Sequence, residues 1–341
     1  MRSKDNSYPT PTNLGNTVIH YIPQIAEQLK NKGLDVFGWL AGVGLDVTCL
    51  TKPGYKVSIS TYSALLKQAI ELTGDGALGL RLGCNLLPSA HGNVGLAAVS
   101  ANTIQQSMQV VERYVPLRTS LLTIRSETVN DEFRVVFEPI LGLGDIGNVV
   151  AEIALGTVKN VIDATEPNNS PCKKILFSMS EPAHAGIALE LLGCEVLYGQ
   201  SWTGIALNYS EVLSPLIHRD ALVMSEALSI CQRDLERLDA NQSIASRLER
   251  LLLESKQGEF PNQNMCAKLL NLTPRTFHRR LREDKTSYRN ILNNVRCRLA
   301  HEYLKMMHLG VKETAYLLGY GDIANFRRAF TRWYGFPPSK L

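Results

Sequence analysis

The chain has 341 residues, of which 45% are hydrophobic and 20% are charged, the balance of a folded protein with enough length for two domains. It contains no run of about eighteen apolar residues and begins with a polar segment, so we expect neither membrane spanning nor export and place the protein in the cytoplasm. The seven cysteines stand singly without a C-x-x-C pair, which favours reduced thiols over a disulfide or zinc framework.

The charge is unevenly distributed along the chain. Residues 241–341 contain 18 Lys and Arg against 8 Asp and Glu, whereas residues 1–240 contain 18 against 24. A basic module therefore follows a mildly acidic one. Attraction to phosphate groups is expected of the basic module alone.

The N-terminal quarter is predicted to be helical. Apolar residues at helical spacing indicate helices over residues 17–32 and 58–72, the second ending at Gly74. The glycine-rich segment at residues 91–95 lacks the Gly-Lys-Ser/Thr of a phosphate loop and the G-x-G-x-x-G spacing of a dinucleotide site. We interpret it as a turn between packed helices.

Helices and strands then alternate without a strict βαβ repeat. Thr103 is expected to cap a helix that runs to Val115, and residue alternation predicts a β-hairpin of residues 121–129 and 132–138. The further predicted elements are a helix at residues 146–164, a strand at 174–178, a helix at 183–192 and strands at 196–198 and 203–209. The fold class predicted for residues 13–215 is therefore α+β.

Residues 216–242 are interpreted as a helical linker. Residues 221–238 have helical spacing with mixed charge, and residues 239–243 have the composition of a joint. Such a helix can pair with a second subunit or serve as a charged connector, and the sequence leaves both roles open.

Residues 243–341 are predicted to form an all-α domain with two helix-turn-helix units. In the first unit, a helix over residues 265–270 precedes a recognition helix over 273–282, with Thr273 as its cap and Pro274 at its first position. Phe277 and Leu281 lie four residues apart and are predicted to face a core. The hydrogen-bond donors of the helix are predicted on its outer face, and they are Arg275, His278, Arg279 and Arg282.

The second unit repeats this pattern near the C-terminus. A helix over residues 311–318 and a turn at 319–321 precede another recognition helix over 322–333, which Asp322 is expected to cap. The predicted buried stripe is Phe326, Phe330 and Trp333, and the predicted outer residues are Asn325, Arg327, Arg328 and Arg332.

One helix is expected to join the two units. Residues 287–307 have the pattern of a single helix of about twenty residues, roughly 30 Å long and close to one turn of B-DNA. Two recognition helices so spaced could enter successive major-groove segments on one face of a duplex.

The outer side chains have alternative roles. Arg275, His278 and Arg279 are candidates for contact with base edges, where Arg bonds guanine, and contact with phosphates alone is the alternative. Asn325 suits adenine, and Arg328 either reaches DNA or turns inward between two core Phe residues. Phosphate contacts, or structural roles in caps and salt bridges, are expected for Thr276, Arg280, Arg282, Thr286 and Tyr288.

No catalytic or metal site is predicted. The histidines show no ligand spacing beyond the isolated pair His301 and His308, and a structural zinc needs four ligands. No Ser-His-Asp or Cys-His arrangement falls at a recognisable spacing. We therefore expect no cofactor, no metal and no enzymatic activity.

A set of residues across the C-terminal module falls at the spacing of a known family. The set comprises Arg275, Thr276, Phe277, Arg279, Leu281, Thr286, Ser287, Tyr288, Arg296, Ala300, Leu304, Ala315, Gly319, Tyr320, Phe326, Arg328, Phe330, Gly335 and Pro338. On these residues the chain from Ile244 to Leu341 resembles the DNA-binding domain of AraC/XylS-type transcription regulators. The sequence departs from the family pattern at three places. Lys285 replaces a usual Gly, Thr314 replaces an apolar residue, and the chain stops before a usual final Arg.

The N-terminal region carries a less specific resemblance. It rests on Gly92, Gly95-Leu-Ala, Thr103, the segments 109–114 and 133–137, and Leu213-Ser-Pro215. Residues 13–216 thereby resemble the arabinose-binding-like domain of the AraC-type subgroup that includes ornithine-utilisation regulators. In that subgroup the domain is taken to sense a small effector or to mediate dimerisation.

Together the resemblances imply a sequence-specific transcription regulator, with effector-responsive activation as the family's commoner outcome. The implied partners are double-stranded promoter DNA, RNA polymerase, a small-molecule effector and a second copy of the chain in a homodimer. Two alternatives stay open, a constitutive dimeric regulator without ligand and a small-molecule enzyme with a DNA-binding tail. A cavity of several hundred Å³ with convergent polar groups in the N-terminal domain would favour a ligand.

Overall fold

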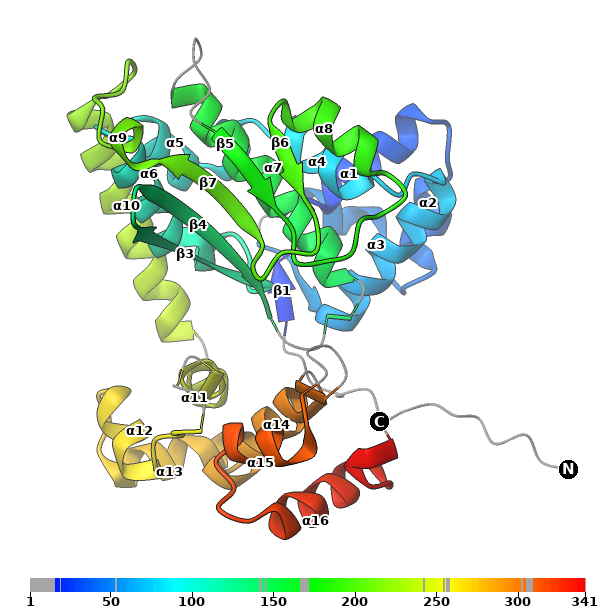
Figure 1. Cartoon of the computed structure of the whole chain (residues 1–341), viewed down its shortest axis with the longest axis vertical. Helices are drawn as coiled ribbons and strands as arrows, with labels where there is room; N and C mark the ends of the chain where they lie inside the picture. The colour runs from blue at the N-terminus through cyan, green and yellow to red at the C-terminus, as the bar shows by residue number, and fades with distance from the viewer. Residues whose placement is uncertain are drawn as a thin grey trace, which may run out of the picture. The chain divides into compact units, whose positions relative to one another are not determined.

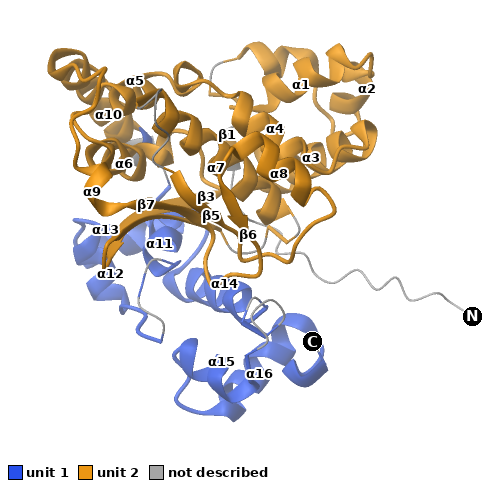
Figure 2. Cartoon of the chain, turned by 45° about the horizontal axis from the view of Figure 1, so that its top comes forward, with its two compact units in different colours: residues 1–15, 238–341 blue, residues 16–237 orange. Residues whose placement is uncertain are grey.

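The computed structural model describes residues 16–18, 20–52, 54–140, 143–144, 146–165, 172–241, 243–253, 255, 258–301, 303–304 and 309–340. Residues 16–237 form one compact unit, and the described residues from 238 onward form the other; Figure 2 colours them separately. The domain start expected at residue 13 lies outside the described residues.

The first unit opens with a small sheet and three helices. The elements are β1 (Asn16–Val18), α1 (Ile22–Asn31), α2 (Val36–Ala41), β2 (Lys56–Ser58) and α3 (Ile59–Thr73). The helix predicted from Thr17 therefore begins five residues too early, because Thr17 instead pairs with Val57 in an antiparallel ladder. Local periodicity cannot reveal a strand whose partner lies so far along the chain.

Three short helices follow α3, and side chains cap the starts of α3 and α6. The elements are α4 (Leu78–Asn85), α5 (Asn93–Val99) and α6 (Ile104–Tyr114). Ser58 accepts from the Thr61 amide at the start of α3, and Thr103 accepts from the Gln106 amide at 3.1 Å, which confirms the predicted cap of α6. Each of these bonds satisfies an amide that has no partner within its helix.

A five-stranded sheet completes the unit. Its strands are β3 (Leu122–Val129), β4 (Glu132–Pro139), β5 (Cys172–Leu176), β6 (Glu195–Leu197) and β7 (Gly204–Asn208), in the order β3-β4-β7-β5-β6. Every neighbouring pair is antiparallel except β5 and β6. The predicted hairpin is confirmed, with Asn130 at its turn in the left-handed conformation. The helices gather on one side of the sheet (Figure 2).

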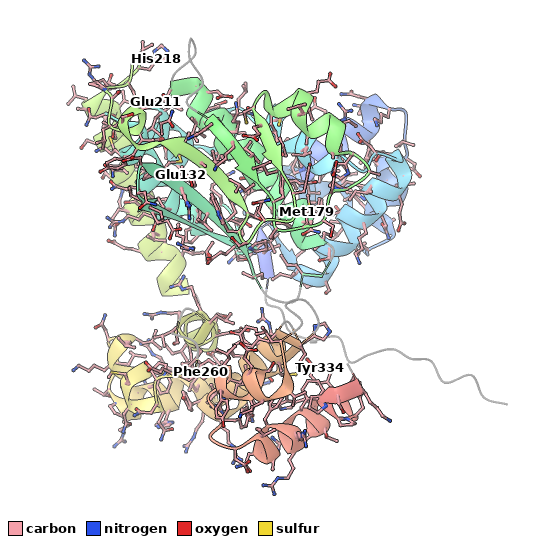
Figure 3. All side chains as sticks on the ribbon, viewed as in Figure 1. Glu132, Met179, Glu211, His218, Phe260 and Tyr334 are labelled. Atoms are coloured by element: carbon pink, nitrogen blue, oxygen red, sulfur yellow. The ribbon has the colours of Figure 1, made fainter. Side chains whose placement is uncertain are left out.

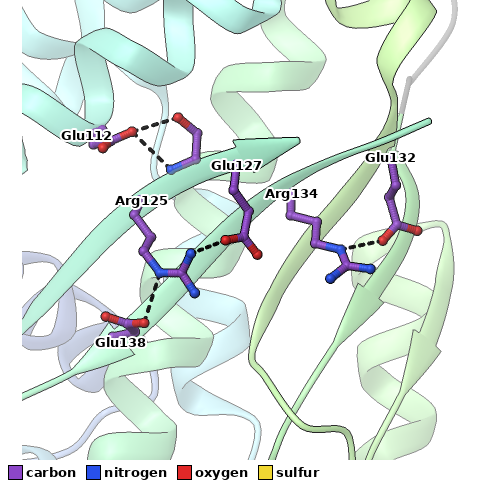
Figure 4. A network of polar contacts seen from close by, with 7 residues as sticks. Glu112, Arg125, Glu127, Glu132, Arg134 and Glu138 are labelled. Atoms are coloured by element: carbon purple, nitrogen blue, oxygen red, sulfur yellow. Dashed lines mark hydrogen bonds and ion pairs between the residues drawn. The ribbon is translucent and has the colours of Figure 1, made fainter. Parts of the chain in front are cut away.

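The other face of the sheet carries ion pairs. Arg125 pairs with Glu127 and Glu138, and Glu132 pairs with Arg134 at 2.7 Å (Figure 4). Phe133, Val135 and Phe137 alternate along β4 and are buried on the helix side. Val136, on the other face, is buried as well.

The edge strand β3 has a bond partner outside the sheet. The carboxylate of Glu112, on α6, accepts from the Ser126 amide at 3.0 Å and from the Ser126 hydroxyl at 2.6 Å (Figure 4). A backbone donor of an edge strand would otherwise be open to another chain.

Helix α7 (Ile146–Thr165) is the central helix of this unit and contacts α3, α4, α5, β4 and β7. Glycines let α4 and α7 approach closely. A methyl group at Gly83 would lie 2.4 Å from the Ile153 carbonyl oxygen, and one at Gly156 would lie 2.8 Å from the Cys84 amide. The two backbones therefore pack with no room for a side chain at these positions.

A buried hydrogen bond between a carboxyl group and an imidazole joins α7 to the start of α8 (Ala185–Leu192). Glu152 is 2% exposed, and its carboxylate lies 2.7 Å from Nε2 of His184. Burial raises the pKa of Glu152, while the hydrogen bond from His184 opposes the increase.

Two of the cysteines that stand alone in the sequence meet in space. Cys172 at the start of β5 and Cys194 just before β6 have their sulfur atoms 3.2 Å apart. All seven cysteines are free thiols. Sequence spacing does not predict this contact, because it arises only when β5 and β6 pair in parallel.

Helix α10 (Ala221–Asn241) runs to the end of the first unit and into the second. Asp220 caps it by accepting from the amides of Leu222 and Val223. The helix continues through Asn241, three residues past its predicted end at residue 238. The N-terminal unit is α+β, as predicted.

The second unit is all helical, as predicted. Its elements are α11 (Ile244–Leu253), α12 (Gln263–Leu269), α13 (Pro274–Glu283), α14 (Tyr288–His301), α15 (Val311–Leu317) and α16 (Ile323–Tyr334). Figures 1 and 2 show α14 between the α12–α13 pair and the α15–α16 pair.

The close packing of α4 on α7 generates a stability prediction. Gly83→Ala should destabilise the N-terminal unit by about 1–3 kcal/mol, because its methyl group would overlap the Ile153 carbonyl. Thermal unfolding of the full chain measures the change. Gly186→Ala is the matched control, since this exposed helical glycine has no atom within 4 Å of the added methyl and should stabilise by up to about 1 kcal/mol. Equal melting temperatures for the two variants would contradict the close approach.

Candidate DNA interface

Helix α13 begins as the sequence predicts. Thr273 accepts from the Thr276 amide at 3.2 Å, and Pro274 occupies the first helical position. The hydroxyl of Thr276 lies 2.9 Å from that of Thr273, so it takes part in the cap. Phe277 and Leu281 are buried, as predicted.

The opposite face of α13 is exposed and cationic. All of Arg275, His278, Arg279, Arg280 and Arg282 are exposed. Arg279 lies 3.7 Å from Glu283, one turn further along. Both side chains of this pair are largely exposed, so the pair is weak and can open when a phosphate or a base competes for the guanidinium.

Helix α16 repeats this arrangement with one correction. Asp322 accepts from the Ala324 amide at 3.0 Å, which confirms it as the cap, and Phe326 and Phe330 are fully buried. Trp333 is only half-buried, so its place in the buried stripe is wrong. The aromatic stripe continues at a spacing of four instead, and Tyr334 lies with its ring centroid 4.6 Å from that of Phe330.

The outer face of α16 holds Asn325, Arg327, Arg328 and Arg332, all exposed. A guanidinium nitrogen of Arg328 donates to Oδ1 of Asn325 at 2.7 Å. Arg328 therefore lies along the helix surface and does not turn inward between the two Phe residues. Its bond orients the Asn325 amide before any base is present.

Few carboxylates neutralise these two faces. Within the described ranges, Arg279 is the one exposed arginine of α13 or α16 with an acidic side chain within 4 Å. The other guanidinium groups have no acidic partner among the described residues and, apart from the Arg328 nitrogen that donates to Asn325, can donate to phosphate oxygens or to the acceptors of guanine.

Helix α14 holds both units through Arg296. Its guanidinium carbon lies 5.3 Å from the ring centroid of Phe260, before α12, and 4.8 Å from that of Tyr320, between α15 and α16. Phe260 is labelled in Figure 3. Stacking of one cation on two rings connects segments that belong to different helix-turn-helix units.

Gly319 permits this arrangement. It has a φ of 69°, and a methyl group on it would lie 3.0 Å from the Gly258 carbonyl oxygen and 3.2 Å from Nη2 of Arg296. Arg296 also donates to the Gly319 carbonyl at 3.4 Å. A side chain at this position would separate the turn from the arginine.

Further bonds from α14 fix its neighbours. The Tyr334 hydroxyl donates to the Cys297 carbonyl at 2.9 Å, which ties α16 to α14 (Tyr334 is labelled in Figure 3). Arg298 is buried and pairs with Glu249 of α11. Sequence reasoning gave neither Arg298 nor Tyr334 a role, because their partners lie 49 and 37 residues away.

Two candidate phosphate contacts have mixed outcomes. The Tyr288 hydroxyl donates to the Pro261 carbonyl at 2.8 Å, so this side chain ties α14 to the segment before α12. Thr286 is half-buried beyond the end of α13, and its amide donates to the Leu281 carbonyl. The residue that caps α14 is its neighbour Ser287, which accepts from the Asn290 amide.

The described part of the joining helix begins where the sequence predicts. Helix α14 has 14 residues, Tyr288 to His301, and a length of about 21 Å. Tyr303 and Leu304 are π-helical, and the Tyr303 carbonyl accepts from the Leu309 amide. The predicted end at Met307 lies outside the described residues, as does His308.

The departures from the family pattern leave structural traces. Lys285, where the family usually has Gly, has a φ of 54°, the left-handed conformation that side chains disfavour. Thr314 is fully buried, and its hydroxyl oxygen has no hydrogen-bond partner among the described residues.

No group of three or more metal-ligating side chains occurs in the described part of the chain. No helix within that part is both long enough and apolar enough to cross a membrane.

Two helix-turn-helix units, each with one face buried and an exposed cationic recognition helix, define a DNA-binding protein. Comparison with known proteins agrees. Residues 33–216 match the family described as the arabinose-binding domain of AraC transcription regulator, N-terminal, and residues 266–341 match a helix-turn-helix domain.

Relatives extend over most of the chain. The ornithine utilization regulator of Pseudomonas aeruginosa is 30% identical over 292 residues, which cover 85% of each chain. The regulator VqsM of the same organism is 25% identical over 81% of this chain and 86% of its own. The crystal structure of CdpR from Pseudomonas aeruginosa aligns over 94% of this chain and 97% of its own, with 20% identity and a TM-score of 0.48. The chain belongs to the AraC family and is a DNA-binding transcription regulator.

Lys285→Gly should stabilise the C-terminal unit by about 1 kcal/mol, because glycine adopts a φ of 54° without the steric cost that lysine has. Asn271→Gly is the matched control. Asn271 has a φ of 56°, but asparagine tolerates this conformation better, so the gain should be smaller. Denaturant unfolding of the full chain measures both, and a loss of stability in Lys285→Gly would contradict the assigned backbone conformation.

Arg296→Met should lower the stability of the C-terminal unit by about 1–2 kcal/mol and weaken binding to every DNA sequence, because the cation that holds Phe260 and Tyr320 is lost. The stability of Arg296→Lys should lie between those of the wild type and Arg296→Met, since lysine keeps the charge but lacks the planar guanidinium surface. Arg289→Met, on the exposed side of the same helix, is the control for thermal unfolding. A variant at Arg296 as stable as this control would rule out the bridging role.

Proposed function

We propose that α13 and α16 read two major-groove segments of one promoter. Base contacts come from Arg275, His278, Arg279, Asn325 and Arg328. Phosphate contacts that set the register come from the remaining candidates, Thr276, Arg282, Thr286, Arg327 and Arg332. The observation that carries the proposal is that two recognition helices expose cationic side chains while α14 contacts both units through Arg296. The exposed residues are Arg275, His278, Arg279 and Arg282 on α13 and Asn325, Arg327, Arg328 and Arg332 on α16.

The division of the chain follows its charge and its matched families. We assign effector sensing or dimerisation to residues 13–215, a linker role to 216–242 and DNA binding to 243–341. The basic module supplies the attraction to phosphates, which is independent of sequence and falls with salt.

We further propose that the protein is an effector-responsive activator that acts as a homodimer and contacts RNA polymerase. Support for an effector comes from the match to the arabinose-binding domain and from a cavity inside the N-terminal unit. That cavity has about 70 Å³ of space, below the several hundred Å³ expected of an ordinary ligand pocket. Three of its lining residues have buried polar atoms without a hydrogen-bond partner among the described residues.

The alternatives have weaker support. A constitutive dimeric regulator would need no cavity lined by unpaired polar groups. An enzyme would need a nucleophile or an acid and base beside the cavity. Its lining includes no Asp, Glu, Ser or Cys, and its one histidine, His91, is bonded to the Tyr21 hydroxyl. The relatives are regulators, and we propose that this chain has no enzymatic activity.

Arg279→Ala should weaken specific binding by about 1–3 kcal/mol and relax the preference at one base position, because an arginine that bonds guanine discriminates against other bases. Operators selected from random DNA, each then changed at single positions, would be compared by gel shift. Glu283→Ala is the matched control, since it removes the partner of Arg279 while keeping the cation, and it should not weaken binding. An equal loss on every sequence would reassign Arg279 to a phosphate.

A further inference from the structure

The N-terminal unit encloses a cavity between its helices and strand β3. Residues of α5, α6, α7 and β3 line it, and most of its surface is apolar. Representative lining residues are Val94, Val111, Leu122, Val150, Ile153 and Val158. The cavity has about 70 Å³ of space, which is more than one water molecule requires.

Three unpaired polar atoms occur on this apolar lining. Nε2 of His91, Nε of Arg118 and Oγ1 of Thr157 are buried, have no hydrogen-bond partner among the described residues, and belong to residues that line the cavity. His91 is 5% exposed. Buried polar groups are normally paired, so three orphans on one small cavity indicate a missing partner.

The neighbours of these groups show what they offer. Nδ1 of His91 lies 3.1 Å from the Tyr21 hydroxyl. Burial, with the nearby charge of Arg118, lowers the pKa of His91 to about 4, so the ring is neutral near pH 7. When the tyrosine donates to Nδ1, the ring proton lies on Nε2 and is offered to the cavity.

Arg118 supplies the charge of the site. One of its terminal nitrogens donates to the Ala90 carbonyl at 3.0 Å, while its Nε has no acceptor among the described residues. No carboxylate in the described ranges lies within 4 Å of its guanidinium, and the lining includes no Asp or Glu. The cavity therefore has two N–H donors, one hydroxyl and a positive charge without its counterion.

This combination selects a ligand by charge and size. A carboxylate complements the guanidinium and accepts from the other two donors. The apolar remainder of the lining suits a short hydrocarbon chain, and the volume limits that chain to a few carbons. An amino acid such as ornithine fits poorly, because its ammonium groups would have no acidic side chain to pair with.

We propose that this cavity binds a short-chain aliphatic monocarboxylate, with its carboxylate held by Arg118, His91 and Thr157. The proposal rests on the effector response proposed above and names the chemical class of that effector.

The fold offers a connection from the cavity to the linker helix. Val111 of α6 lines the cavity, and its near neighbours Arg113 and Tyr114 contact Oε1 of Gln232, on α10, at 2.8 and 3.4 Å. Helix α10 continues toward the DNA-binding unit. A ligand in the cavity contacts α6, and α6 also bonds to α10. Binding can therefore shift the position of the linker helix α10.

Calorimetric titration of the full chain with propionate, butyrate and hexanoate tests the proposal, with butylamine, butanol and ornithine as charge controls. We expect saturable binding of at least one carboxylate and none of the amines. Thr157→Val should weaken it several-fold, and Arg118→Met about tenfold or more. Thr123→Val, on the exposed face of β3, is the matched control and should bind as wild type does. Arg118→Lys serves if the Met variant does not fold, and it should retain partial binding.

The outcomes separate this inference from the proposed function. Flat titrations for every carboxylate up to about 10 mM would leave water as the occupant and overturn the inference. If Thr157→Val binds the carboxylate as tightly as Thr123→Val does, the assigned site is wrong. If butylamine binds as tightly as the carboxylates do, the assigned charge of the site is wrong. Promoter binding is measured in parallel by gel shift. If a carboxylate binds at this site but leaves promoter affinity and transcription unchanged, the effector role fails. If promoter binding is absent both with and without the carboxylate, the result counts against the DNA interface alone.

Discussion

The arrangement of the DNA-binding unit depends on one cation between two rings. Arg296 stacks on Phe260 and on Tyr320, so a single side chain of α14 fixes the segment before the first helix-turn-helix unit and the turn of the second. Gly319 must lack a side chain for the same reason. Because each recognition helix also buries its own aromatic or aliphatic stripe, neither can rotate without breaking its core. The outward direction of the arginines on α13 and α16 follows from these constraints.

Much of this unit could be predicted from the sequence, because its signals are local. Thr273 and Asp322 cap helices within three residues, and the spacing of Phe277 and Leu281 sets the buried face of α13. The predictions that failed concern features that depend on residues far away in the sequence or on tertiary packing. Strand β1 forms only by pairing with β2, and Tyr334 rather than Trp333 packs its ring against Phe330.

The cavity in the N-terminal unit illustrates the same limit. Tyr21, His91, Arg118 and Thr157 are separated widely in sequence, and none belongs to a recognisable motif. They meet because α7 packs against α4 on one side through glycines and presents aliphatic residues on the other. The contact of Cys172 with Cys194 has a similar origin in the pairing of β5 with β6. Sequence alone identified the class of the domain, whereas its chemistry required the tertiary structure.

The bond between Glu112 and Ser126 has a consequence for self-association. Strand β3 lies at the rim of the sheet, and eight residues of its backbone border no further strand. The carboxylate of Glu112 occupies a donor there that a second chain would need for strand addition. A second chain that added a strand at this rim would have to break the bond from the Ser126 amide to Glu112, so this carboxylate acts against pairing at this edge of the sheet.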